Sequence, residues 1–249
     1  MNRFIRLPRG LVPVFVSALA FASLSGPVAA QSALTSFGSV GGAPQAPWKV
    51  VGLPQQTKPF TQFSVVDIDG VRALRIEANE SYGNLVHPVR YSGGSAHLAW
   101  QWRMEKQIEN ADLRTRSGDD TAVKVCVFFD MPMDNIPFAD RQILRMARSK
   151  TSDVVPGATV CYVWDARLAA GTTLDNAFTR RMRYVVVRSG SGPLRQWMSE
   201  RRDVAADFVK LFGAELDRIP PIIAVAVGAD ADNTHTQSLA YVGSLVLEP

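Results

Sequence analysis

The strongest constraint on the fold of this chain is a series of short segments in which apolar and polar residues alternate. In the segment 95–103, Leu98, Trp100 and Trp102 occupy every second position, and Gln101 and Arg103 fall on the other face. A period of two is typical of a half-buried β-strand. Further runs that are alternating or continuously apolar occur at 61–68, 71–78, 121–129, 159–164, 182–189, 195–203, 221–229 and 238–248.

These runs predict the fold class. Asp69-Gly70 separates the first two runs and is a favoured pair for a hairpin turn, because both residues tolerate positive φ. Two helices are expected, one over 139–150 and one that begins after Asp203 as N-cap and ends before Gly213. About ten strands with no strand–helix–strand rhythm predict an all-β fold, an antiparallel β-sandwich with one or two short helices.

The first thirty residues have the pattern of a secretory signal peptide. Arg3, Arg6 and Arg9 form a basic start, residues 11–24 are mostly apolar, and 28–30 read Val-Ala-Ala before Gln31. The alternative is a membrane anchor, but the apolar run is short for a membrane span and Pro13 interrupts it. We therefore expect a signal peptide at 1–30, a flexible leader at 31–47 and a single sandwich domain at 48–249. The expected location is periplasmic or secreted, and no transmembrane segment is expected after cleavage.

The charge balance bears on the partners of the mature chain. The whole chain has 27 Lys and Arg against 23 Asp and Glu, and removal of the first thirty residues takes away three arginines and no acid. The remaining 24 against 23 is close to neutral. A nearly neutral domain gives no electrostatic reason to expect a nucleic-acid partner.

The two cysteines each lie within a predicted strand. Cys126 is in the run 123–129 and Cys161 is in the run 159–164. In an oxidising compartment they would form a disulfide if the two strands are neighbours. The alternative is two separate buried thiols that behave as small apolar residues.

Two acidic clusters border predicted strands and are candidates for a Ca²⁺ site. Asp119 and Asp120 precede the run at 121–129, while Asp230 and Asp232 follow the run at 221–229. The start of one antiparallel strand can lie beside the end of its neighbour, so we expect the four carboxylates to converge. Carboxylates gathered together need a positive partner, either Ca²⁺ or a protein cation.

The protein cations considered for these acids are Arg114 and Arg116. The acidic segments have a plainer interpretation as well, in which Arg114 or Arg116 pairs with the first cluster and the second cluster forms a turn. The segment from Asp230 resembles an EF-hand start, but His235 stands where that loop needs Gly.

A third polar cluster and one tyrosine are candidates for ligand contact. Tyr82 and Trp197 are placed near expected loops, and exposed aromatic faces stack on sugar rings. Glu200 and Arg201 follow Trp197 and would supply polar contacts in a groove. The alternative for this cluster is a salt-bridged entry to the helix after Asp203.

Common catalytic motifs are missing from the sequence. It has three histidines, none of them in H-E-x-x-H, and it has no G-x-S-x-G, no phosphate-binding G-x-x-x-x-G-K-S/T and no G-x-G-x-x-G. The sequence therefore leaves open whether the chain is an enzyme, with a binding protein favoured.

An ordered set of segments resembles a known family. It comprises WQWR at 100–103, SGDD at 117–120, YVW at 162–164, VVVRSG at 185–190, ERRDVAADFVKLFG at 200–213 and ADADNT at 229–234. In this order they are similar to the bacterial exported domain-of-unknown-function family numbered 3047, over about residues 45–249. The excursion at 131–157 is longer than in the family pattern, and Ser244 stands where that pattern has an acid. The resemblance implies an envelope protein and names no activity.

The strand pattern also resembles the galactose-binding type of jelly roll, which is an analogy of fold alone. Together these observations favour an exported, non-catalytic binding protein for a carbohydrate or a cell-envelope component. One alternative is an envelope glycan hydrolase that uses Asp119, Asp120, Asp230, Asp232 or Glu200 as acids. Another is a structural envelope subunit.

Overall fold

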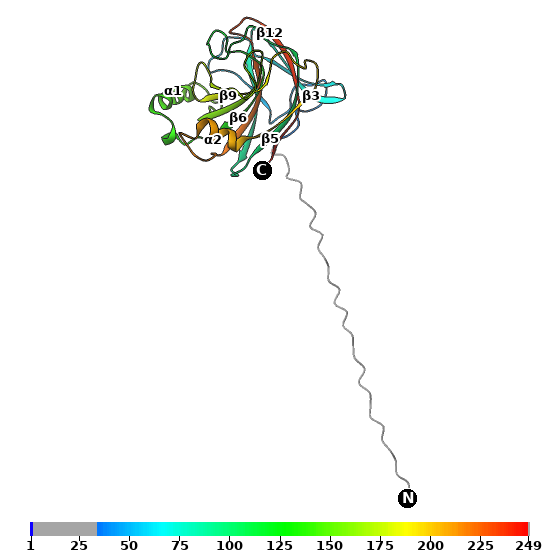
Figure 1. The fold of residues 1–249 in the computed structure, drawn as a ribbon, viewed down its shortest axis with the longest axis vertical. Coiled ribbons are helices and arrows are strands. Elements are labelled where there is room, and N and C mark those ends of the chain that lie inside the picture. Colours follow the sequence, from blue (N-terminus) through cyan, green and yellow to red (C-terminus); the bar gives the residue numbers. More distant parts are fainter. Residues whose placement is uncertain (2–33, 249) are drawn as a thin grey trace. The chain divides into compact units, whose positions relative to one another are not determined.

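The protein is a sandwich of two β-sheets, seen in a computed structural model that describes Met1 and residues 34–248 (Figure 1). Apart from Met1, the predicted signal peptide at 1–30 lies outside the described residues. Residues 34–248 belong to one compact unit. The seven-stranded sheet has the order β1 (Lys49–Val51), β4 (Tyr82–Tyr91), β11 (Ile222–Asp230), β6 (Thr121–Phe129), β7 (Ala158–Asp165), β9 (Met182–Ser189) and β8 (Thr173–Asp175). The five-stranded sheet has the order β10 (Met198–Asp203), β5 (His97–Lys106), β12 (Gln237–Glu248), β3 (Val71–Asn79) and β2 (Gln62–Ile68).

Three short helical elements accompany the sheets: η1 (Met133–Asn135), α1 (Phe138–Ser149) and α2 (Val204–Phe212). Neighbouring strands are antiparallel except for β7 and β9, which are parallel. The fold class expected from the sequence, an antiparallel jelly-roll-like sandwich with short helices, is therefore confirmed. No described helix is long and apolar enough to cross a membrane.

Alternation along the strands assigns one face to the core and the other to the outside of the sandwich. On β6, Val123, Val125 and Val127 are fully buried between the sheets, and Lys124 and Cys126 point to the opposite face of the sheet. The core is rich in aromatic rings, among them Trp100 and Trp102 on β5 and Tyr162 and Trp164 on β7. Ring centres of pairs from opposite sheets lie 5.2 and 5.8 Å apart.

The predicted hairpin is present. Asp69 and Gly70 connect β2 to β3 with φ angles of 54° and 76°, the left-handed values that this turn requires. Strand β4 was not predicted, and Tyr82, which the sequence placed near a loop, is its first residue. Gly83, Asn84 and Pro88 interrupt the apolar pattern of this strand, although it lies between two neighbours in the sheet.

The segment expected to be a flexible leader packs on the sandwich over its described part, 34–47. Leu34 and Phe37 are buried, and the Phe37 ring lies 4.8 Å from that of Trp48. The backbone of Val65 on β2 accepts from Gly41 over 2.8 Å and donates to Gly42 over 2.9 Å. This segment thus covers part of the open edge of β2. Its Gly- and Pro-rich composition did not indicate this pairing.

Candidate functional site

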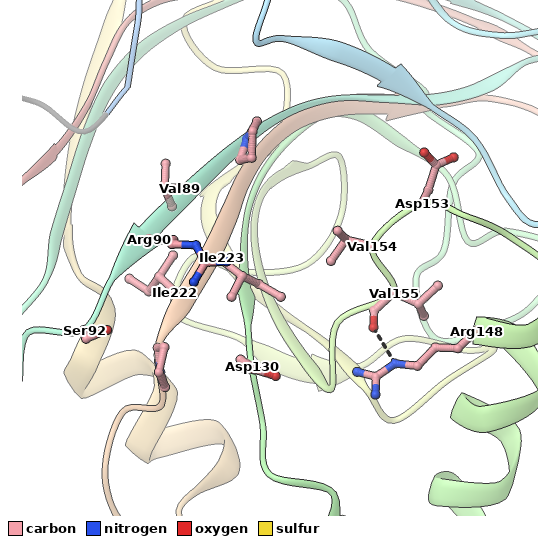
Figure 2. A pocket seen from close by; sticks show the side chains of 12 residues that line it. Val89, Arg90, Ser92, Asp130, Arg148, Asp153, Val154, Val155, Ile222 and Ile223 are labelled. Carbon is pink, nitrogen blue, oxygen red and sulfur yellow. Dashed lines mark hydrogen bonds between the residues drawn. The ribbon is translucent and has the colours of Figure 1, made fainter.

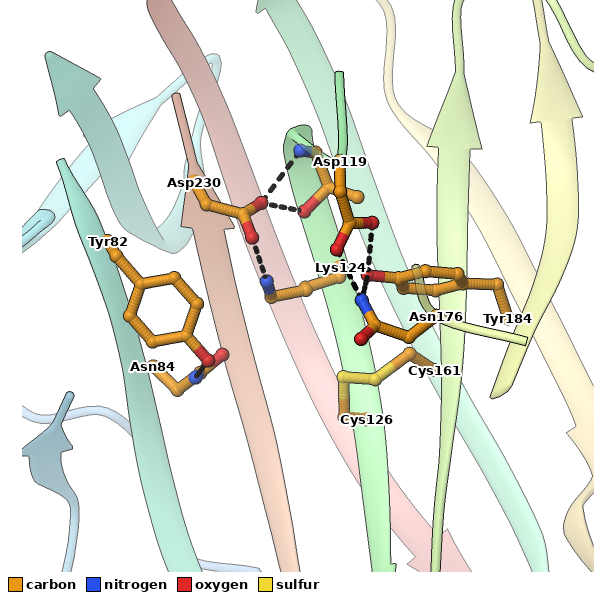
Figure 3. The surroundings of a disulfide bond; sticks show 10 residues. Tyr82, Asn84, Asp119, Lys124, Cys126, Cys161, Asn176, Tyr184 and Asp230 are labelled. Atoms are coloured by element: carbon orange, nitrogen blue, oxygen red, sulfur yellow. Dashed lines mark hydrogen bonds and ion pairs between the residues drawn. A yellow bond between two sulfur atoms is a disulfide. The ribbon is translucent and has the colours of Figure 1, made fainter. Parts of the chain in front are cut away.

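A cavity of about 350 Å³ opens on the outer face of the seven-stranded sheet. It lies where β4 and β6 begin and β11 ends. Because these strands are antiparallel, their ends meet at one end of the sheet. Figure 3 shows the side chains that reach this place from neighbouring strands. The lining residues are Leu53, Tyr82, Asp119, Lys124, Asn176, Phe178, Thr179, Met182, Tyr184, Asp230, Asp232 and Asn233.

A buried ion pair forms the floor of the cavity. The Lys124 side chain is 1% exposed, and its Nζ lies 2.7 Å from Oδ2 of Asp230 and 5.0 Å from the centre of the Tyr82 ring. Oδ1 of Asp230 accepts from the backbone N–H of Thr121 over 2.7 Å and also from the Thr121 hydroxyl. Burial alone would lower the pKa of Lys124, but the nearby Asp230 carboxylate outweighs it and the pKa is raised. Lys124 therefore remains a cation.

Asp119 supplies a second carboxyl group from the loop before β6. Its Oδ1 accepts from the Tyr184 hydroxyl over 3.1 Å, and its Oδ2 accepts from the amide of Asn176. Burial, and after it repulsion from Asp230, raises the pKa of Asp119 to about 6. Burial also raises the pKa of Tyr184 well above its usual value, so its hydroxyl stays protonated. Asp119 is thus a carboxyl group that takes up and releases a proton near neutral pH.

Gly228 on β11 leaves the space that the side chain of Asn84 on β4 occupies. A Cβ on Gly228 of β11 would overlap the side-chain oxygen of Asn84 on β4. The amide of Asn84 crosses this gap and donates to the Tyr82 hydroxyl over 3.0 Å. Gly228 therefore fixes the position of Asn84 and, through it, of the Tyr82 ring at the cavity.

Asp120 fastens the loop that follows β11. Its Oδ1 accepts from the backbone and amide nitrogens of Asn233, and its Oδ2 accepts from the backbone N–H and hydroxyl of Thr234 over 2.7 and 2.5 Å. In the same loop, Oδ1 of Asp232 is buried and has no hydrogen-bond partner among the described residues. Burial, followed by repulsion from Asp120 and Asp230, raises the pKa of Asp232. Asp120 therefore holds this loop through several hydrogen bonds, and one carboxylate oxygen of Asp232 has no hydrogen-bond partner among the described residues.

The four aspartates predicted as Ca²⁺ ligands do not make up one set of oxygen ligands. Asp119, Asp230 and Asp232 do line the same cavity, as the strand ends predicted. However, the oxygens of Asp120 and Asp230 are taken by N–H and O–H donors of the chain itself. Within the described residues, no three His, Cys, Asp or Glu side chains are grouped so that they could hold a metal ion.

The cation that compensates these acids is Lys124 and neither of the arginines considered from the sequence. Arg114 pairs with Asp112, two residues away, over 2.8 Å. Arg116 donates to the carbonyl of Ala177 and lies over the Phe178 ring at 5.4 Å. Both arginines thus hold loops at the rim of the sheet, while the buried lysine balances the charge.

Cys126 and Cys161 are joined by a disulfide next to the cavity (Figure 3). They face each other on the antiparallel strands β6 and β7, with their Cα atoms 4.0 Å apart. Cys126 is two residues from Lys124 on the same face of β6, so the bridge ties the strand that carries the buried lysine to its neighbour.

The residues predicted to contact a ligand are divided between the two sheets. Tyr82 lines the cavity, but Trp197, Glu200 and Arg201 lie on or just before β10 at the edge of the five-stranded sheet. Oε1 of Glu200 accepts from the Trp102 indole over 3.1 Å and pairs with Arg188, so this oxygen is engaged within the protein.

The rest of this segment is structural as well. Arg201 approaches Glu248 at 3.8 Å, and Asp203 caps α2 by accepting from Ala206 over 2.9 Å. Arg202 also pairs with Asp207 of α2 over 2.6 Å, so the geometry of this cluster fits the salt-bridged helix entry. The ligand contact of Trp197, Glu200 and Arg201 stays a prediction, and these residues lie away from the cavity of Tyr82.

Several residues of the site were not predicted: Lys124, Asn176, Phe178 and Tyr184. Only Lys124 had a sequence signal, because it is a charged residue inside the buried run VKVCVFF and a buried lysine needs a partner.

A second, larger hollow lies at the opposite ends of the same three strands (Figure 2). This groove has a volume of about 820 Å³ and is lined largely by apolar side chains such as Val89, Val154 and Ile223. It contains no buried ion pair among its described residues, and Arg148, at its wall, donates to the Val155 carbonyl over 3.0 Å. The convergence of buried charge distinguishes the smaller cavity as the candidate site.

Comparisons with known proteins give a family and several solved structures of low similarity. Endoglucanase 3 of family GH12 from Trichoderma harzianum is 10% identical, with a TM-score of 0.39 over 82% of this chain and 98% of that one. The cellulose induced protein Cip1 is 10% identical, with a TM-score of 0.38 over 80% of this chain and 90% of that one. The K3 cleaved adhesin domain of Lys-gingipain from Porphyromonas gingivalis w83 is 8% identical, with a TM-score of 0.35 over 82% of this chain and 93% of that one.

These likenesses are weak, and no statement about function rests on them. No curated protein matches the sequence. The sequence profile of the family described as "Protein of unknown function (DUF3047)" matches residues 46–246. That match spans most of the chain and agrees with the resemblance of its ordered segments, so the chain belongs to the DUF3047 family.

Proposed function

We propose that this protein is an exported binding protein that holds one sugar unit of a glycan or another envelope component in the cavity beside Lys124, without cleaving it. The observation that carries this proposal is the composition of that single cavity. Aromatic rings of Tyr82, Tyr184 and Phe178 share it with carboxyl and amide groups, among them Asp232 and Asn233.

The chemistry of a sugar matches both parts of this lining. Its C–H faces pack on aromatic rings, and its hydroxyl groups donate to carboxylates and exchange hydrogen bonds with amides. Oδ1 of Asp232 is such an unused acceptor, and 54% of Phe178 is exposed at the rim. The volume of about 350 Å³ is at the lower end of ligand pockets, which range from about 300 to 1,000 Å³. It therefore suits one ring better than an oligosaccharide.

The cavity is also built to keep its shape. Tyr82, Lys124 and Tyr184 lie on strands, the disulfide joins the strand of Lys124, β6, to its neighbour β7, and Asp120 holds the loop that carries Asp232. A binding site that is rigid before the ligand arrives loses less entropy on binding. This rigidity favours selective binding over a site that has to form around its ligand.

Export is part of the proposal. The disulfide between Cys126 and Cys161 supports it, because such bonds persist in oxidising compartments such as the periplasm and the outside of the cell. The protein recovered from its native host should begin at Gln31 or within a few residues of it. An intact mass that includes Met1 would contradict export.

Glycan hydrolysis is the second candidate, and one observation favours it. Asp119 has a pKa of about 6 and lines the cavity, which are properties of a general acid for a glycosidic oxygen. We favour binding because both oxygens of Asp119 already accept hydrogen bonds, from Tyr184 and Asn176.

The test is calorimetric titration of residues 31–249 with a panel of oligosaccharides built from hexoses and N-acetylhexosamines, combined with a reducing-end assay of the same mixtures. We expect saturable binding without new reducing ends. Phe178→Ala should weaken it about tenfold, since loss of a stacking ring costs about 1–1.5 kcal/mol. Phe138→Ala, which removes a Phe that is 73% exposed on α1, is the control and should bind as the wild type does. New reducing ends that disappear with Asp119→Asn would establish hydrolysis, and no binding to any member would overturn the proposal.

A further inference from the structure

Helix α1 buries few of its apolar side chains against the domain. Leu144 is its single buried residue, while Phe138, Ile143 and Met146 are 73%, 59% and 55% exposed. Burial of one large side chain of this kind contributes about 1.5–3 kcal/mol, so leaving three in water forgoes a substantial gain. The helix has an apolar surface that the described part of the chain does not cover.

Two of the exposed apolar residues of α1, Ile143 and Met146, share one side of the helix, and Phe138 lies at its first position. Positions 139, 143 and 146 are spaced by four and three residues, so Ala139, Ile143 and Met146 lie along one side of the helix. Val154, in the segment that follows the helix, is 58% exposed and lies at the wall of the larger groove (Figure 2). We call Phe138, Ile143 and Met146 the α1 surface.

The basic residues of α1 fall into two groups. Arg141 donates to the carbonyl of Ile136 over 3.1 Å, and Arg148 donates to that of Val155, so both attach the helix to its own surroundings. Arg145 and Lys150 are exposed and have no ion-pair partner among the described residues. The acid on the helix does not compensate them, because Asp140 faces Arg181 at 3.3 Å.

We propose that the α1 surface binds the surface of an anionic lipid bilayer. Apolar side chains would enter the boundary between headgroups and acyl chains, and Arg145 and Lys150 would meet the lipid phosphates. A protein partner fits the surface less well. A helix of twelve residues is about 18 Å long and about 10 Å wide, a footprint well below the roughly 1,000 Å² of buried surface in a stable protein interface. This proposal is independent of the sugar cavity.

The experiment is co-sedimentation of residues 31–249 with lipid vesicles, which avoids the apolar run at 11–24. We expect binding to vesicles of phosphatidylglycerol and phosphatidylethanolamine, little binding to pure phosphatidylcholine, and release by high salt. Ile143→Gln/Met146→Gln should lower the partition coefficient about tenfold or more, and Arg145→Gln/Lys150→Gln should lower it in anionic vesicles alone.

The matched control is Val209→Gln, which changes a 42% exposed apolar residue of the other helix and should leave vesicle binding unchanged. All these positions are exposed, so each variant is expected to melt as the wild type does. Absence of binding to anionic vesicles, or equal binding by Ile143→Gln/Met146→Gln, would overturn the proposal. So would a dimer in size-exclusion chromatography that Ile143→Gln/Met146→Gln turns into a monomer, because a second copy of the chain would then cover the surface.

Discussion

Nζ of Lys124 lies 2.7 Å from Oδ2 of Asp230, and the two side chains are 1% and 6% exposed. They come from β6 and β11, more than a hundred residues apart in the sequence and adjacent in the sheet. A charge buried this deeply is tolerated only with a partner. The pair therefore fixes the end of the sheet where the cavity opens.

Removal of the lysine alone should be strongly destabilising. Lys124→Met leaves the Asp230 carboxylate buried without its cation, and breaking a buried pair in this way costs about 3–5 kcal/mol. The measurement is the free energy of unfolding in urea. The double variant Lys124→Met/Asp230→Asn should regain most of the loss, because the remaining amide oxygen still accepts from Thr121. A double variant as unstable as the single one would contradict this account of the pair.

Stability should depend on pH through Asp119. Its pKa is about 6 in the folded protein and about 3.8 in the unfolded chain, so the folded state binds its proton more tightly. The contribution of the Asp119 proton to the free energy of unfolding is fully present below pH 3.8 and is lost as the pH rises to about 6. The loss amounts to roughly 3 kcal/mol at most. Asp119→Asn cannot lose a proton, and its amide can still bond with Tyr184. Denaturation curves from pH 4 to 7 should show this falling component in the wild type and lack it in the variant; identical pH profiles would refute it.

The disulfide should contribute substantially to stability. The cysteines are 35 residues apart, and closing a loop of that length is worth about 4 kcal/mol in the chain-entropy model. Cys126→Ala/Cys161→Ala should lower the melting temperature as much as full reduction of the wild type does. A reduced protein that melts at the temperature of the oxidised one would show that the bridge adds nothing.

Calcium should not change the stability. Lys124 balances the acids beside the cavity, and Asp120 is saturated by Asn233 and Thr234. Melting curves with added calcium and with chelator should coincide. A melting temperature that rises with calcium concentration would mean that the native state binds the ion, as the acidic clusters in the sequence predict, and would contradict this expectation.

The sequence predicted the sandwich because alternation reports which face of a strand is buried, and this pattern is local. It failed for β4, where Gly83 and Asn84 lack the apolar signature of a strand. Their place in the sheet depends on Gly228 of β11, whose missing side chain leaves room for the Asn84 amide. Such a contact between distant strands leaves no trace in a window of neighbouring residues.

The sequence also predicted only part of the candidate site, namely its acids. Asp119, Asp230 and Asp232 were identified because they stand at strand ends, and an antiparallel sheet places such ends side by side. The sequence did not identify the cation, since Lys124 looks like an exception within an apolar run until Asp230 is placed beside it. The partners of Glu200 were missed for the same reason, because Trp102 and Arg188 come from other strands.

The most direct test of the central claim is to locate the bound sugar on the protein. Residues 31–249 would be labelled with ¹⁵N and titrated with the member of the oligosaccharide panel that binds most tightly, with amide chemical shifts recorded at each step. The account predicts that the largest changes fall in residues 176–184 and 230–233, which line the cavity beside Lys124. Changes centred instead on β10 near Trp197 or on the groove near Val154, or no changes with any sugar, would contradict it.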